Sequence, residues 1–146
     1  MAGAYMTGSA EFVRTSVDGV PAFWTQAGHG LTAGLVFRLG RADESLAHGG
    51  ITHLIEHLAL FPFGADTSMH YNGEASPITT TFLTRGSPAE IAAFLTAVCA
   101  SLAGLPVERL RAEKQVLRAE AASRQPAMTG PLFIQRYGAA TYGLAA

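Results

Sequence analysis

GITHLIEHLAL, residues 50–60, has the spacing of a short amphipathic helix. Its apolar side chains recur on one side and would make the helix half buried; they are Ile51, Leu54, Ile55, Leu58 and Ala59. His53 and His57 are four residues apart, so they lie on one helical face, one turn from each other. Glu56 flanks the same face, and the sequence FPFG that follows is typical of a helix end.

Two imidazoles at this spacing can reach one metal ion, and neutral imidazoles are good Zn²⁺ ligands. A carboxylate beside the metal, here that of Glu56, can take a proton from bound water. The pattern H-x-x-E-H is also the inverted form of the commoner zinc-peptidase motif H-E-x-x-H. The alternative interpretation is that these three residues are simply the polar side of a half-buried helix. A third ligand elsewhere in the chain would favour the metal site.

The composition is that of one globular domain spanning residues 1–146. Hydrophobic residues make up 49% and charged residues 14%, which is enough for a packed core. The net charge is −1, so nothing indicates binding to nucleic acid or to an acidic membrane surface. The single cysteine, Cys99, excludes an internal disulfide and lies in an apolar run, where we expect it to be buried. With no secretory signal and no apolar run of membrane-spanning length, we expect a cytoplasmic protein.

The order of expected elements indicates an α+β fold in which a mostly antiparallel sheet packs against helices. Strands are expected at residues 11–17, 20–26, 31–39 and 78–84, the first two joined by the hairpin turn Asp18-Gly19 and the third central. Residues 65–77 are expected to be a polar loop or a short strand. Helices are expected at residues 88–102, 107–124 and 131–137, and the first of these has a capping box formed by Ser87 and Glu90. His29 and His48 are expected in loops.

Glu113 and Glu120 are seven residues apart, so two helical turns place them on one face of the 107–124 helix. Taken alone, such acidic residues are usually solvated and paired with arginines one turn away. Beside the histidine pair they matter more, because a His/His/Glu set is a known catalytic zinc set that leaves one position open for water.

Together these residues resemble the active half of the pitrilysin/insulinase-type zinc metallopeptidases, which include the mitochondrial processing peptidases. In that family H-x-x-E-H is followed downstream by E-x6-E on a helix, which Glu113 and Glu120 match. Further agreement extends from about residue 12 to the end, at Gly40, Arg41, Glu44, Asn72, Thr80 and residues 133–144. The resemblance implies a metallopeptidase half-domain.

The resemblance also implies roles. His53, His57 and Glu120 would bind one Zn²⁺ per chain, and Glu56 would be the general base. Glu113 would orient a ligand from outside the metal's own shell. The strand at Asn72 and Gly73 would bind an extended peptide or unfolded polypeptide through main-chain hydrogen bonds.

The chain departs from the family pattern in three ways. It is short, because family members have two related halves, and it resembles an incomplete first half. The stretch between His57 and Asn72 is shorter than usual, and Gly73 replaces the usual alanine. Three hypotheses follow: a zinc metalloendopeptidase, or the catalytic half of one; a non-catalytic subunit or scaffold with the family fold; and a fragment without a function of its own. A second half-domain subunit, or another copy of the chain, is the expected partner.

Overall fold

In a computed structural model, the described residues are 12–26, 28, 30–64, 70–123 and 129–144. The chain divides into two units, Met1–Leu31 and Thr32–Ala146. The described part of the first unit is a hairpin of β1 (Val13–Val17) and β2 (Val20–Trp24), paired antiparallel. Asp18 and Gly19 have φ of 50° and 81°, the positive values that a tight hairpin turn requires. The predicted hairpin is therefore confirmed.

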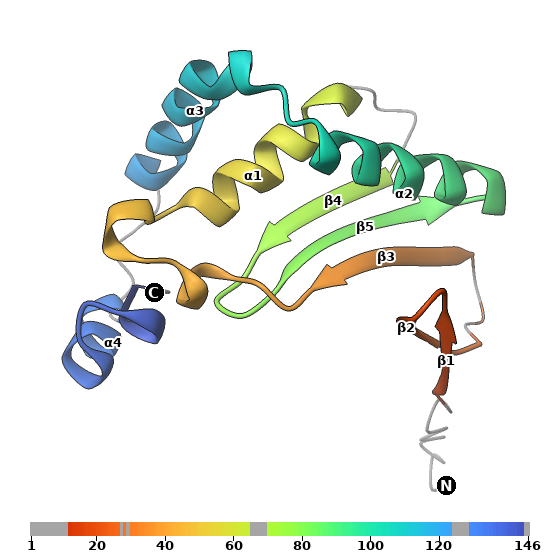
Figure 1. Ribbon diagram of the computed structural model, residues 1–146, viewed down its shortest axis with the longest axis horizontal. Coiled ribbons are helices and arrows are strands. Elements are labelled where there is room, and N and C mark those ends of the chain that lie inside the picture. Colours follow the sequence, from red (N-terminus) through yellow and green to blue (C-terminus); the bar gives the residue numbers. More distant parts are fainter. Residues whose placement is uncertain (1–11, 27, 29, 65–69, 124–128, 145–146) are drawn as a thin grey trace, which may run out of the picture. The chain divides into compact units, whose positions relative to one another are not determined.

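The second unit contains a three-stranded sheet of β3 (Leu31–Phe37), β4 (His70–Ala75) and β5 (Thr80–Gly86), in the order β3-β5-β4. The arrows of β3 and β4 in Figure 1 run opposite to that of β5. A short strand is thus formed within residues 65–77, one of the two outcomes expected there. The prediction that residues 31–39 are central is wrong for the described sheet. The central strand is β5, whose Phe82 is 1% exposed, whereas Val36 on β3 is 66% exposed.

The described residues form four α-helices: α1 (Ile51–Leu60), α2 (Pro88–Ala103), α3 (Leu110–Ser123) and α4 (Thr129–Tyr137). The predicted capping box begins α2: Ser87 Oγ accepts from the Glu90 amide at 3.3 Å, and the Ser87 amide donates to Glu90 at 2.7 Å. The α-helix predicted from residue 107 begins later, because Val107–Arg109 forms a 3-10 turn. Other 3-10 turns are η1 (Arg41–Asp43), η2 (Leu46–His48), η3 (Phe61–Phe63) and η5 (Thr141–Leu144). The α+β class is confirmed.

The hydrophobic core lies where α1 and α2 pack against β4 and β5 (Figure 1). Its fully enclosed residues are Ala59, Phe82, Phe94 and Val98. Cys99, predicted to be buried, is exposed. The physical reason is helical spacing: the buried positions of α2 are 91, 94, 98 and 101, so the residue after Val98 points away from the core. Among the described residues no single helix is long and apolar enough to cross a membrane; α2 and residues 107–123 reach that threshold only as a pair bent by 75°.

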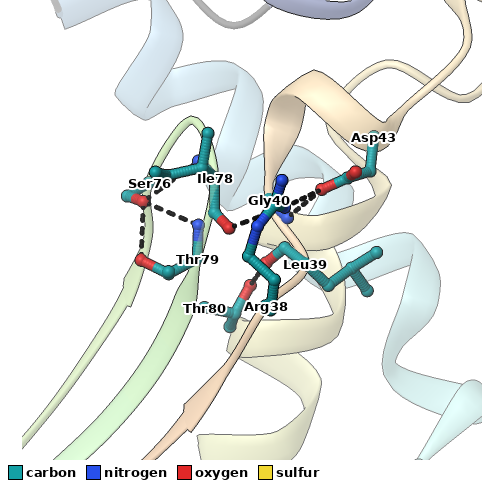
Figure 2. Close-up of polar contacts among 8 residues, drawn as sticks. All are labelled: Arg38, Leu39, Gly40, Asp43, Ser76, Ile78, Thr79 and Thr80. Atoms are coloured by element: carbon teal, nitrogen blue, oxygen red, sulfur yellow. Dashed lines mark hydrogen bonds and ion pairs between the residues drawn. The ribbon is translucent and has the colours of Figure 1, made fainter.

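The connection from β3 into η1 is fixed on the turn between β4 and β5 (Figure 2). The Thr80 hydroxyl donates to the Leu39 carbonyl at 2.8 Å, and the Arg38 guanidinium donates to the Ile78 carbonyl at 3.2 Å. The Gly40 amide donates to Asp43 Oδ2 at 2.8 Å. A Cβ atom on Gly40 would lie 2.6 Å from the backbone of Pro77 and Ile78, so this approach requires glycine. The contact fixes the chain immediately before the site.

Candidate metal centre

Helix α1 is held at its N-terminus by Glu44. One oxygen of this carboxylate accepts from the Gly50 amide at 2.6 Å, and the other accepts from the Thr52 amide at 2.9 Å. Amides at a helix start have no intrahelical acceptor, and a negative charge there is favourable. Glu44, identified in the sequence only through the family resemblance, therefore fixes the beginning of the motif helix.

The apolar side of α1 anchors the opposite face of the helix. Leu54, Leu58 and Ala59 are buried as predicted, and Ile55 is half-buried. Ile51, the first residue of the helix, is exposed although it belongs to the predicted apolar stripe. With this side packed inward, the face that carries the two histidines turns toward α3, which contacts α1.

His53, His57 and Glu120 form a group that could hold a metal ion, with one ligand atom from each lying within 4.8 Å of the others. Each histidine has its Nε2 atom 3.6 Å from an oxygen of Glu120. The centroids of the two imidazole rings are 4.8 Å apart, and the ring planes are nearly perpendicular. We call these three residues the ligand trio. All three side chains are partly exposed, so the trio leaves an approach for a further ligand.

Glu56 lies beside the trio and is buried, 6% exposed. Its Oε2 atom is 3.7 Å from His53 Nε2. Burial raises the pKa of Glu56 above its usual value, His57 lowers this pKa, and Glu120 raises it. A carboxylate with a raised pKa accepts a proton more readily, which suits a general base.

Glu113 is buried on α3 and contacts His57, one of the three residues of the trio. Its Oε2 atom lies 3.4 Å from His57 Nδ1. The other oxygen of Glu113 lies 3.5 Å from an amino group of Arg109, and the Arg109 guanidinium sits 4.3 Å above the ring of Phe61. The sequence analysis expected pairing with an arginine one turn away only in general and did not name Arg109, although its spacing of four residues before Glu113 was a usable signal for a helical ion pair.

The strand predicted to bind substrate is at the margin of the sheet, because β4 is an outer strand in the order β3-β5-β4. Gly73 lies against Glu56, and a Cβ atom there would be 2.9 Å from the Glu56 carboxyl carbon. Asn72 is exposed on the opposite face of the strand, since neighbouring side chains alternate. Gly73 therefore allows the close approach of Glu56 to the strand.

Two hollows meet at Glu56. One, of about 300 Å³, is lined by Arg41, His53, Glu56 and residues 73–75. The other, of about 250 Å³, is lined by Glu56, His57, Leu60, Phe61, Gly64, Tyr71 and Glu113. His53, His57 and the Glu56 carboxylate thus border open space.

The remaining histidines lie outside the ligand trio. His48 is on η2, not in an irregular loop, and its Nδ1 atom is 2.8 Å from the Ser45 hydroxyl. His70 begins β4, and His29 lies outside the described residues.

No family model matches the chain, and searches of curated proteins and of solved structures give no match.

Proposed function

We propose that this chain is a zinc-dependent endopeptidase of the pitrilysin/insulinase type, or the catalytic half of one. The observation that carries the proposal is the approach of Glu120 on α3 to both histidines of α1, with Glu56 beside them. Two imidazoles and one carboxylate are the donor set of a catalytic zinc site with an open position. The exposure of the trio leaves room for water and substrate.

In the proposed hydrolysis, the trio and the residues around it have separate roles. Zinc bound there would polarise a peptide carbonyl and lower the pKa of water to roughly 7. Glu56 takes the proton from water and returns it to the leaving amine. Glu113 accepts a hydrogen bond from His57 Nδ1 and keeps the Nε2 side of that ring directed at the trio.

The margin of β4 supplies a place for an extended peptide. A strand at the margin of a sheet has unpaired main-chain groups, and a peptide that adds to it is held without regard to its side chains. Since Gly73 contacts Glu56, a peptide lying along β4 would pass the proposed base. Asn72 and Gly73 are therefore the proposed substrate-binding positions.

The test combines metal analysis with hydrolysis of an unfolded polypeptide. Purified chain should contain about one zinc, and His57→Ala should lose it. Glu56→Gln should keep the zinc and lose hydrolysis, because the amide cannot accept the proton. Glu108→Gln, an exposed carboxylate outside the site, is the matched control and should leave both unchanged. Zinc-free folded protein, or full hydrolysis by Glu56→Gln, would overturn the proposal.

A second candidate function is a non-catalytic subunit or scaffold. It is favoured by large apolar side chains that are exposed in the second unit, among them Leu46, Val36, Val107 and Leu132. A second half-domain subunit or another copy of the chain would cover such residues. This candidate would be favoured over the peptidase if light scattering shows a stable assembly and the protein hydrolyses no peptide, either with or without added zinc.

A further inference from the structure

We propose that Arg41 binds a carboxylate group of the peptide next to the bond being cleaved, a step that rests on the proposed peptidase function. The 300 Å³ hollow that Arg41 lines also contains His53 and Glu56. A group bound in this hollow therefore lies beside both a proposed metal ligand and the proposed base. Residues 73–75 of β4, the proposed substrate strand, line the same hollow.

The position of Arg41 is fixed before any ligand arrives. Its amide donates to the Ser76 carbonyl at 3.0 Å, and the next amide, of Ala42, donates to the Pro77 carbonyl at 2.8 Å. Gly40, directly before it, is packed on the same turn without room for a side chain. These bonds tie the backbone of Arg41 to the turn that follows β4, so on binding only the side chain of Arg41 has to be ordered.

The guanidinium of Arg41 has no protein counter-ion among the described residues. Its Nε atom is buried and has no hydrogen-bond partner there. Arg109 Nε is likewise buried without a hydrogen-bond partner, but the Arg109 guanidinium has a carboxylate 3.5 Å away on Glu113, and Arg38 has one 3.4 Å away on Asp43. A buried donor left unpaired is costly, so Arg41 is suited to receive an acceptor from outside the chain.

The chemistry of arginine selects a carboxylate. The guanidinium is always charged and presents a planar fork of donors that matches two carboxylate oxygens. A peptide offers this group either as an acidic side chain or as its own C-terminus. Both sources have the same recognition chemistry, and the position of Arg41 beside residues 73–75 places the group within a residue or two of the cleaved bond.

The test measures binding in place of turnover. The protein is the zinc-loaded Glu56→Gln chain, which leaves peptides intact. The probes are six-residue peptides, matching β4 in length. One set has capped ends and a glutamate moved through each position; a second has glutamine in its place; a third has glutamine and a free C-terminal carboxylate. Fluorescence anisotropy gives each dissociation constant.

We expect at least one carboxylate peptide to bind about tenfold more tightly than its capped glutamine counterpart, as for a charge-assisted bidentate contact. Preference for internal glutamate assigns a side chain, and preference for the free end assigns the C-terminus. Arg41→Gln should remove the preference, and Arg41→Lys should reduce it because lysine lacks the fork. Arg111→Gln, on an exposed position of α3 away from the hollow, should preserve it.

Equal binding of all peptides, absence of binding, or a preference that survives Arg41→Gln would overturn the proposal. The two proposals fail separately. Carboxylate-selective binding without zinc-dependent hydrolysis would contradict the peptidase function alone. Hydrolysis without carboxylate preference would contradict the role of Arg41 alone.

Discussion

His57 Nδ1 on α1 lies 3.4 Å from an oxygen of Glu113 on α3, a helix that follows all three strands of the sheet in the sequence. An ionised carboxylate can only accept, so His57 donates from Nδ1 and its Nε2 atom is free to bind metal. We expect Glu113→Gln to weaken zinc affinity about 10- to 100-fold, the usual loss when a partner of a metal-bound histidine is changed. Competition with a chromophoric chelator measures this affinity.

The control for that experiment is Glu108→Gln, which removes an equal charge from an exposed position in the 3-10 turn that leads into α3. It should leave zinc affinity unchanged. Equal weakening by both variants would mean that net charge, and not the contact with His57, determines the effect.

Arg109 holds the other oxygen of Glu113 and lies over Phe61. We expect Arg109→Gln to weaken zinc affinity less than Glu113→Gln does, by about fivefold or below, because a partly exposed ion pair contributes at most about 1 kcal/mol. The same chelator competition measures it. A loss larger than that of Glu113→Gln would show that Arg109 acts on the site by another route.

The raised pKa of Glu56 predicts a pH-dependent stability of the metal-free chain. Burial favours the protonated form, so this group's contribution to stability is fully present below its unfolded-state pKa and is lost as pH rises through the folded-state pKa. Glu56→Gln mimics the neutral form at every pH. Metal-free Glu56→Gln should therefore unfold at higher denaturant than the unmodified chain at neutral pH, with the difference shrinking on acidification. A difference independent of pH would contradict this assignment.

Gly40→Ala should destabilise the second unit. The added methyl would meet the backbone of Pro77 and Ile78, which cannot yield as a flexible side chain can, and overpacking of this kind costs about 1–3 kcal/mol. Denaturant unfolding measures the loss. Gly49→Ala is the control, because a Cβ atom there meets only the Leu46 carbonyl, at an ordinary 3.7 Å. Similar losses in both variants would contradict the steric explanation.

Local signals in the sequence were sufficient for most elements. Asp18-Gly19 gave the hairpin, and Ser87 with Glu90 gave the start of α2, because turns and caps depend on neighbouring residues alone. The place of β3 in the sheet was not predictable in this way. Strand order depends on which faces are buried by distant elements, and an apolar sequence such as that of β3 does not reveal it.

In the candidate site too, the features set by neighbouring residues were predictable from the sequence, and those that depend on distant elements were not. Helical periodicity brought His53 and His57 together, and zinc chemistry pointed to a glutamate as third ligand, but only the resemblance to a peptidase family selected Glu120 over Glu113. Cys99 was predicted to be buried because it lies in an apolar run, but the composition of a run does not indicate which of its residues faces outward. The placement of the Arg41 backbone depends on a turn far along the chain, so the sequence around Arg41 contained no signal for it.

The ligand trio brings together residues of α1 and α3, two helices that are separated in the sequence by β4, β5 and α2. A metal ion held by both helices is therefore a removable cross-link, and its binding is coupled to folding. At a free zinc concentration of about 100 times the dissociation constant, the folded state would gain roughly 2.7 kcal/mol. The melting temperature of this chain would then report the zinc level of its surroundings, whether or not it ever cleaves a peptide.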